Sequence, residues 1–348
     1  MTHATTRRRF PTALAALTAA AAVLLSASAC VSREDGSGAA ANEIVNPSDL
    51  AGLTLQVGDQ KGGTESLLRA AGQLEDTPYK VKFSTFTSGP PQIEAATAGK
   101  IDFAVTGNTP PIFGAASNAK IKIVSAYNNS ATGDAILTKK GSPIKSVSDL
   151  RGMKVAVGKG SSAHAHLLLQ LKKAGLRLGE DVTPVFLQPA DAQSAFTSAN
   201  VDAWAIWDPY TAITQMSPDV RTITTGQGVL NGYGFGVAAT SALDDGKRNT
   251  AIKDLVIRIA KASDWSKRNP ELWSAAYAKA VGIAPQAAKS AQDRSLRTAI
   301  TLDDRVVESE QTVADAFIEA GQIEGNPQFA DYVDQRYNDV VQPFVGKP

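Results

Sequence analysis

Short apolar runs alternate with amphipathic stretches through the first two thirds of the chain. Runs typical of buried strands occur at 80–86, 182–187 and 203–207. Stretches whose apolar residues recur at helical spacing occur at 92–98, 163–174 and 190–199. Strands that alternate with helices predict an α/β protein whose sheets are mostly parallel and carry helices on their faces.

An internal repeat predicts two lobes of like topology. Residues 48–58 (SDLAGLTLQVG) match residues 148–158 (SDLRGMKVAVG), and residues 99–110 lie beside residues 199–209 in a second match. Both matches have the same offset of 100 residues, which two chance similarities would not share. Each copy predicts a turn, a strand and a glycine-containing loop that opens a helix.

Two domains follow from the repeat and from a length of 348 residues, which exceeds what one core usually fills. We predict a discontinuous first lobe, residues 47–136 and 236–348, and a second lobe, residues 137–235. Strand-like runs at 135–139 and 234–239 frame the second lobe and are expected to form a two-strand hinge beside a cleft.

The pattern after these runs is helical only. Residues 252–267 and 306–320 show helical spacing, and Pro270 and Pro285 suit the first turn of a helix. We expect these extra C-terminal helices to pack on the first lobe.

The first 30 residues predict an export signal that is not part of the fold. Arg7, Arg8 and Arg9 precede an apolar run that is too short to span a membrane. This basic region suits the general secretory or the twin-arginine route. Cys30, the one cysteine, follows small residues and resembles a lipobox, which predicts lipid attachment and a protein anchored at the outer face of the cell membrane. Ordinary cleavage that leaves an incidental cysteine is the alternative. Residues 31–46 would be a flexible tether.

Composition narrows the class of partner. Hydrophobic residues make up 43% of the chain and charged residues 20%, with a net charge of +1. Such a balance is typical of a soluble globular protein and gives no electrostatic reason to expect nucleic acid as a partner.

The stretch 201–210 concentrates candidate binding residues at the end of a predicted strand. Asp208 is a good helix N-cap and Pro209 suits the first helical position. Open α/β sheets bind ligands at the carboxyl ends of their strands. Trp207 is therefore interpreted as the wall of a binding site or as core, and Trp204 as core. Asp208 is interpreted as a helix cap or as an indirect contact with the ligand's tail.

Several motifs resemble those of the aliphatic sulfonate-binding proteins of ABC importers. They are 60–62 (QKG), 88–90 (SGP), 106–113 (TGNTPPIF), 159–164 (KGSSAH) and 201–210 (VDAWAIWDPY). The resemblance covers roughly residues 53–210 and implies a type II periplasmic-binding-protein fold. It also implies a monomer that captures an aliphatic sulfonate and delivers it to a membrane permease and its ATPase for sulfur acquisition, without cofactor, metal or catalysis.

Two departures from the family pattern keep other ligands open. Asn108 stands where the family usually has Asp, and Ala163 stands where it usually has a polar residue. Taurine, nitrate or a heterocycle such as a pyrimidine precursor is the first alternative. The second is an enzyme, because pyrimidine-precursor synthases share the fold, although the sequence shows no recognisable catalytic set.

A sulfonate is a permanent anion that needs N–H or O–H donors to replace lost water. Helix starts supply such donors, so Ser161 and Ser162 are expected to bind the head group or to cap their helix, with the loop 62–64 facing them. His164 and His166 point to different sides of a helix, which argues against a shared metal ion. The expected ligand-binding residues are Gln60, Lys61, Gly62, Ser88, Gly89, Thr106, Gly107, Asn108, Ser161, Ser162, His164, Trp207 and Asp208.

Overall fold

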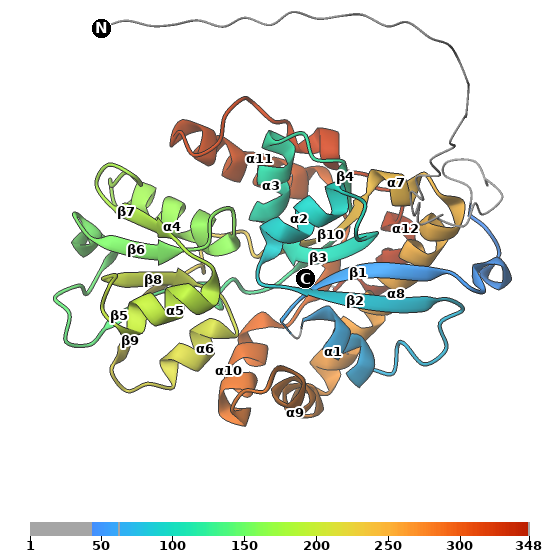
Figure 1. Cartoon of the computed structure of the whole chain (residues 1–348), viewed down its shortest axis with the longest axis horizontal. Helices are drawn as coiled ribbons and strands as arrows, with labels where there is room; N and C mark the ends of the chain where they lie inside the picture. The colour runs from blue at the N-terminus through green and yellow to red at the C-terminus, as the bar shows by residue number, and fades with distance from the viewer. Residues whose placement is uncertain (1–43, 62, 347–348) are drawn as a thin grey trace, which may run out of the picture. The chain divides into compact units, whose positions relative to one another are not determined.

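The computed structural model of the chain describes residues 44–61 and 63–346. Its strands form two mixed β-sheets, and helices cover the faces of both sheets (Figure 1). The predicted export signal, the lipid attachment at Cys30, residues 31–43 of the tether and the candidate Gly62 lie outside the described residues. Among the described helices, none is both long and apolar enough to cross a membrane.

The first sheet has six strands in the order β11-β4-β10-β3-β1-β2. Their bounds are β1 (Thr54–Gln60), β2 (Lys80–Phe86), β3 (Phe103–Gly107), β4 (Ile121–Asn128), β10 (Tyr233–Ala239) and β11 (Thr298–Ile300). β3 is buried along most of its length, as expected for an apolar central strand covered on both faces. Helices cover both faces, with α2 (Gly89–Thr97) on one side and α1 (Thr64–Ala70) and α8 (Gly246–Arg268) on the other (Figure 1).

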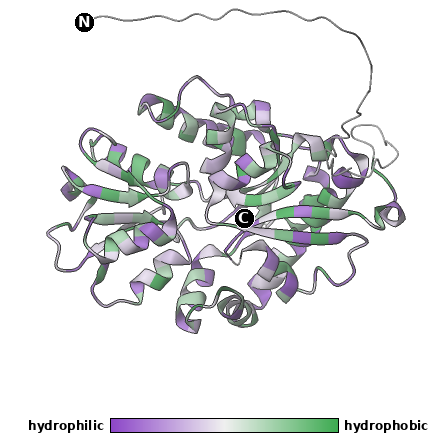
Figure 2. Ribbon diagram, viewed as in Figure 1, coloured by the Kyte–Doolittle hydropathy of each residue, from purple (hydrophilic) through white to green (hydrophobic). Residues whose placement is uncertain are grey.

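The second sheet has five strands in the order β7-β6-β8-β5-β9. Their bounds are β5 (Ala135–Lys139), β6 (Lys154–Val157), β7 (Thr183–Phe186), β8 (Ala203–Ile206) and β9 (Val220–Thr225). Trp204 on β8 is fully buried and packs against Phe196, so it belongs to the core of this lobe, as predicted. Figure 2 shows the apolar residues gathered along the strands and the hydrophilic residues toward the outside of the helices.

The predicted repeat is visible as the same succession of elements in both lobes. Each parallel strand of the first lobe leads into a helix, namely α1 (Thr64–Ala70), α2 (Gly89–Thr97) and α3 (Thr109–Ala116). The strands of the second lobe lead into α4 (Ser162–Lys173), α5 (Pro189–Thr197) and α6 (Tyr210–Gln215). All six helices therefore begin beside the carboxyl ends of strands, where α/β sheets place ligands.

The sheets are mixed rather than mostly parallel. β1, β2 and β3 run parallel, as do β6, β7 and β8, which is the part that the alternating pattern predicted. β10 pairs antiparallel with β3 and β4, and β5 pairs antiparallel with β8 and β9. The reason is that β5 and β10 enter their sheets directly from the other lobe, without the helical crossover that a parallel neighbour needs.

The chain crosses between the lobes in two loops, which adjoin the strands expected to form the hinge. β5 lies wholly in the second sheet and β10 wholly in the first. The crossings are therefore the segments 129–134, between β4 and β5, and 226–232, between β9 and β10.

The C-terminal region is helical except for β11, which the apolar pattern did not predict because it is only three residues long. Its helices are α7 (Thr240–Leu243), α8 (Gly246–Arg268), α9 (Pro270–Val281), α10 (Pro285–Ser295), α11 (Asp304–Glu319) and α12 (Asn338–Val341). The described residues also include four short 3-10 turns, two of them in this region, η3 (Phe329–Tyr332) and η4 (Gln342–Phe344), and two earlier in the chain, η1 (Pro47–Leu50) and η2 (Val147–Leu150). Pro270 and Pro285 begin their helices, as predicted.

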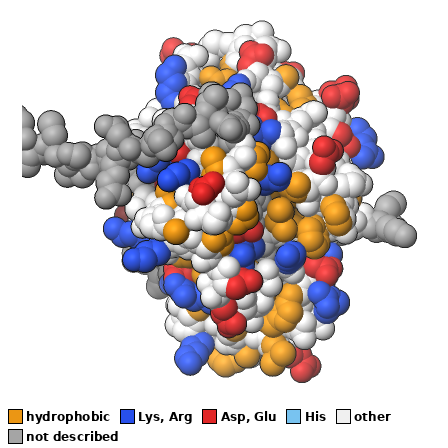
Figure 3. All heavy atoms as spheres, turned by 90° about the vertical axis from the view of Figure 1, so that its right-hand side faces the viewer, with side chains coloured by type: hydrophobic (Ala, Val, Ile, Leu, Met, Phe, Trp, Pro, Cys, Tyr) orange, Lys and Arg blue, Asp and Glu red, His pale blue; other side chains and the backbone are white. Residues whose placement is uncertain are grey.

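These helices do not pack on the first lobe alone. α8 contacts α1, β1 and β11, whereas α10 contacts α6 and α11 contacts α4, both in the second lobe. The C-terminal region thus bridges the two lobes. Its surface and that of the first lobe carry basic and acidic side chains interspersed, as Figure 3 shows for one face, in keeping with the net charge of +1.

Candidate functional site

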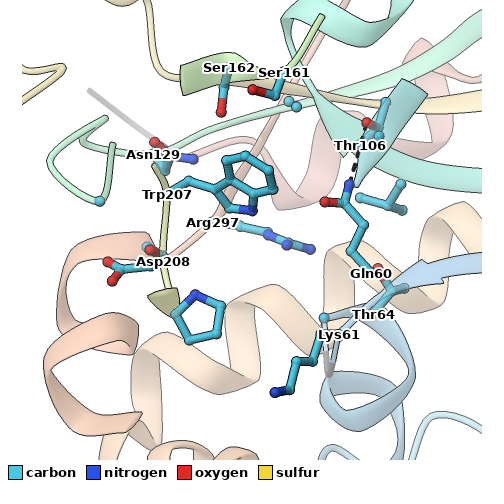
Figure 4. A pocket seen from close by; sticks show the side chains of 18 of the residues that line it. Gln60, Lys61, Thr64, Thr106, Asn129, Ser161, Ser162, Trp207, Asp208 and Arg297 are labelled. Atoms are coloured by element: carbon cyan, nitrogen blue, oxygen red, sulfur yellow. Dashed lines mark hydrogen bonds between the residues drawn. The ribbon is translucent and has the colours of Figure 1, made fainter. Parts of the chain in front are cut away.

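A cavity of about 160 Å³ lies between the lobes, at the carboxyl ends of β1, β3 and β8. It collects many of the residues that the sequence proposed, and Figure 4 shows several of them around one opening. The proposed residues that line it are Gln60, Lys61, Gly89, Thr106, Gly107, Ser161, Ser162, Trp207 and Asp208.

The first-lobe wall is built around the end of β1. The Gln60 side chain donates from Nε2 to Gln92 Oε1 at 3.1 Å and to Thr106 Oγ1 at 3.5 Å. Gly89 leaves room for this arrangement, since a Cβ there would lie 2.2 Å from Thr106 Oγ1. The Lys61 ammonium lies 5.9 Å from the centroid of the Tyr210 ring on the other lobe. Gln60 is thus held in the wall, whereas Lys61 reaches across the opening.

In the described part of the loop before α1, the N–H groups of Gly63, Thr64 and Glu65 are engaged within the protein, contrary to expectation. Asp59 accepts hydrogen bonds from the backbone N–H groups of Thr64 at 2.7 Å and Glu65 at 3.2 Å. Burial raises the pKa of Asp59, while these two hydrogen bonds and the charge of Arg297 oppose the rise. A carboxylate therefore already occupies the end of this short helix.

The second-lobe wall is the start of α4. Ser161 caps the helix: its hydroxyl donates to Gly158 O at 2.7 Å and accepts from His164 N at 3.4 Å. The Ser162 hydroxyl donates to Asp134 Oδ1 at 2.7 Å. Both hydroxyl protons are thus engaged within the protein, and both side chains line the cavity.

Asp208 is neutralised by Arg294, a residue for which the sequence proposed no role. Arg294 donates from Nε and Nη2 to the two carboxylate oxygens at 3.1 and 2.8 Å. Asp208 also accepts from Ala212 N at 3.0 Å, so it does serve the start of α6. That helix begins at Tyr210 rather than at Pro209, which places Asp208 one position outside the formal cap.

Trp207 combines both roles that the sequence left open. Its ring packs against hydrophobic residues of the core and lies 6.3 Å, centroid to centroid, from the Tyr210 ring. The same side chain lines the cavity. Trp207 is therefore a fixed apolar wall of the cleft (Figure 4).

Three proposed residues, Ser88, Asn108 and His164, do not line the cavity. Ser88, next to Thr87, donates to Gln188 Oε1 of the second lobe at 3.1 Å. Asn108 donates to Asn231 Oδ1 in the second crossing loop at 3.2 Å. His164 is 0% exposed, and burial lowers its pKa to about 3.

His164 lies in an aromatic cluster instead of the cleft. Its ring contacts Phe113, Phe186 and Phe317, with centroid distances of 5.9, 5.2 and 5.0 Å. Its Nδ1 accepts from Gly160 N at 3.2 Å. The position next to the serines made His164 look like a ligand contact, but the helix turns its ring toward the first lobe's helices α3 and α11.

Sequence reasoning missed Arg297, whose side chain extends into the middle of the cleft in Figure 4. Its guanidinium carbon lies 4.9 Å from the centroid of the Tyr127 ring. Its buried Nη1 has no hydrogen-bond partner among the described residues. A lone arginine between α10 and β11 belongs to no motif, so only the fold brings it to the cavity.

The chain is similar to a known protein family and to curated relatives. Residues 74–275 match the family described as ABC transporter, phosphonate, periplasmic substrate-binding protein. A protein of Escherichia coli (strain K12) named as an aliphatic sulfonates-binding protein is 36% identical over 269 residues, which are 76% of this chain and 83% of that protein.

Two solved structures resemble this one closely. The alkanesulfonate-binding protein SsuA from Xanthomonas axonopodis pv. citri bound to MOPS has a TM-score of 0.75 and 28% identity, covering 82% of this chain and 99% of that one. The periplasmic aliphatic sulphonate binding protein SsuA from Escherichia coli has a TM-score of 0.71 and 33% identity, covering 81% and 92%. The likeness thus includes most of the described residues.

Proposed function

We propose that this chain, which belongs to the aliphatic sulfonate-binding proteins among the periplasmic substrate-binding proteins of ABC transporters, captures an organosulfonate between its lobes and hands it to a membrane permease. The observation that carries the proposal is the guanidinium of Arg297, which lines the cleft with a buried N–H group that has no partner among the described residues. An unpaired buried donor on a cation is costly unless a ligand accepts from it, and a sulfonate oxygen is such an acceptor.

The head group would lie between Arg297 and the start of α4. Arginine supplies charge and several N–H donors in one plane, and the start of a helix of this length adds a favourable dipole. The amide of Gln60 and the hydroxyl of Ser162 border the same cavity. The protons of both groups are engaged within the protein, so Arg297 and the start of α4 would supply the donors that replace the water a sulfonate loses on binding.

The tail would lie along the rings of Trp207 and Tyr210. A smaller cavity of about 70 Å³ adjoins the first and shares Arg297 with it. Leu67, Trp273 and Leu296 contribute apolar surface to that cavity. An alkyl or aryl tail fits such walls through burial of apolar area.

The two departures from the family pattern do not argue for another ligand class. Asn108 bonds to Asn231 outside the cavity lining, and Ala163 is 0% exposed. Neither residue changes the charge or the donors that a ligand meets in the cleft. A sulfonate therefore remains the ligand that the site fits best.

The protein would act outside the cytoplasm, anchored by a lipid on Cys30, as a monomer that binds and releases its ligand unchanged for sulfur acquisition. The export signal and the cysteine support this placement, although both lie outside the described residues.

A thermal-shift panel of alkanesulfonates tests the proposal. A ligand at about 100 times its Kd adds about 2.7 kcal/mol to the stability of the folded state, which raises Tm by several degrees. Absence of a shift for every sulfonate in the panel would overturn the proposal. Mass spectrometry of the ligand recovered after incubation checks that it is unchanged, and any turnover would identify an enzyme instead.

A further inference from the structure

Asp134 is an acidic side chain that lines the proposed anion-binding cleft and has no cationic partner among the described residues. It is the last residue of the first crossing loop, immediately before β5, and it lines the cavity. Among the described residues only the Ser162 hydroxyl donates to its carboxylate, at 2.7 Å, and no ion pair includes it. A sulfonate bound at the start of α4 would meet this carboxylate directly.

The other acidic groups of the cleft are compensated. Asp208 is paired with Arg294 at 2.8 Å. Asp59 accepts two backbone N–H groups and is influenced by the charge of Arg297. Asp134 is the remaining carboxylate, so its proton decides the charge of the site.

The formal charges near the cleft show what depends on that proton. The cations are Lys61, Arg294 and Arg297, and the carboxylates are Asp59, Asp134 and Asp208. With Asp134 ionised these charges cancel, and with Asp134 protonated one positive charge remains. A monoanion is matched by the protonated form, whereas a zwitterion is matched by the ionised form.

The surroundings of Asp134 bring its titration into the physiological range. Burial is the main cause that raises its pKa to about 7, the nearby charge of Asp208 adds to the rise, and the hydrogen bond from Ser162 opposes it. Tyr210 and Tyr277, which also face the cleft, have raised pKa values because of burial and stay neutral. Burial also raises the pKa values of Asp59 and Asp208, but arginine charges and backbone hydrogen bonds oppose the rise there. Asp134 has no such cation beside it in the described part of the chain, which makes it the carboxylate of the cleft whose proton is expected to follow the ligand.

We propose that Asp134 selects the charge type of the ligand: a sulfonate with a neutral tail is captured together with one proton on Asp134, and a sulfonate that carries an ammonium group binds with Asp134 ionised. The proton comes from solvent and returns to it on release, so charge is balanced in both cases. This inference rests on the proposed function, because it concerns the same cleft and the same ligand class.

The test compares ethanesulfonate with 2-aminoethanesulfonate by calorimetry over a pH series, using the whole exported chain. Because a free pKa of about 7 leaves Asp134 mostly protonated at pH 6 and mostly ionised at pH 8, ethanesulfonate should bind about tenfold more weakly at pH 8 than at pH 6. The affinity for 2-aminoethanesulfonate should rise about tenfold over the same range.

Asp134→Asn provides the matched variant, since it keeps the shape of the side chain and removes the titration. It should bind ethanesulfonate with an affinity independent of pH and should lose the gain for 2-aminoethanesulfonate. Asp191→Asn, on an exposed carboxylate of α5, is the control and should behave as the unaltered protein.

Parallel pH profiles for the two ligands, or an unchanged slope in Asp134→Asn, would overturn the inference while leaving the proposed function intact. Failure of both ligands to bind the unaltered protein at every pH would overturn the proposed function for these two sulfonates and the inference with it. The two failures are therefore distinguishable in one series of measurements.

Discussion

Asp208 and Arg294 join the second lobe to the C-terminal helix α10 through two hydrogen bonds of 2.8 and 3.1 Å. Asp208 lies at the carboxyl end of β8, and its side chain is only 5% exposed, against 22% for Arg294. Because Arg294 compensates its negative charge, the Asp208 carboxylate can border a cleft that receives an anion. It also explains why α10 contacts α6 of the second lobe.

Breaking this pair should destabilise the protein. Arg294→Met leaves a buried carboxylate without its cation, which costs about 3 kcal/mol and lowers Tm by several degrees. Denaturant unfolding measures the loss, and adding Asp208→Asn should recover most of it. The control is Arg268→Met, which removes an exposed ion pair with Asp264 and should change stability by about 0.5 kcal/mol or less. Equal losses in both variants would contradict the buried role.

Arg297→Gln should weaken sulfonate binding by about a hundredfold, because a charged donor in the cleft is removed. Calorimetry with the best ligand of the panel measures the change. Arg305→Gln is the matched control, since Arg305 is 87% exposed and forms an ion pair with Asp303 on the surface. An undiminished affinity in Arg297→Gln would remove this arginine from the site.

Gly89→Ala should distort the first-lobe wall. The added Cβ would lie 2.2 Å from Thr106 Oγ1 and 2.4 Å from Pro110 Cγ, so α2 or β3 must shift. We expect a loss of stability of about 1–3 kcal/mol, with weaker ligand binding. Gly141→Ala, at an exposed position with nothing within 4 Å of the added atom, should be neutral.

Gln188→Ala should weaken the contact between the two lobes. Gln188 Oε1 accepts from the hydroxyls of Thr87 at 2.9 Å and Ser88 at 3.1 Å across the interlobe boundary. Losing these bonds costs about 1 kcal/mol, or about fivefold in affinity, if they form only when the lobes close. Binding assays measure the change, with the exposed Gln335→Ala as a control. A lower Tm without ligand, at equal affinity, would instead indicate bonds that persist in the open form.

His164→Leu should make stability less sensitive to acid. Burial lowers the pKa of His164 from 6.5 to about 3, so below pH 6.5 the unfolded chain binds a proton that the folded protein excludes. Stability therefore falls as the pH falls, by about 2 kcal/mol from this residue between pH 7 and 5. Melting curves over that range should be flatter for the variant, and sulfonate affinity at pH 7 should be unchanged. Loss of affinity would return His164 to the binding residues.

Much of the fold could be predicted because it depends on local pattern. The alternation of apolar runs with amphipathic stretches, and the motif repeated at 48–58 and 148–158, predict like strand-loop-helix units in the two lobes. Strands and helices of that kind are determined by periodicity within a few residues. The antiparallel pairing of β5 and β10 could not be predicted from local pattern, because it depends on which lobe the chain comes from as it enters each strand.

The candidate site likewise has residues that local sequence predicts and residues whose contacts only the fold decides. Residues at strand ends, such as Gln60 and Trp207, were predictable because strand ends converge on one edge of a sheet. Ser88 and Asn108 lie beside such ends, yet their side chains turn to Gln188 and Asn231, which are distant in the chain. The direction in which a side chain points at a strand end depends on hydrogen-bond partners that are distant in the sequence, and the local sequence does not reveal them.

The sequence by itself determined that two similar α/β lobes face each other and which loops border the space between them. Only the tertiary structure decided the charge in that space. Arg297 and Arg294 come from the C-terminal region and Asp134 from a crossing loop, so each is far in sequence from the motifs it adjoins. Electrostatic interaction depends on distance in space and on burial, and both are properties of the folded chain.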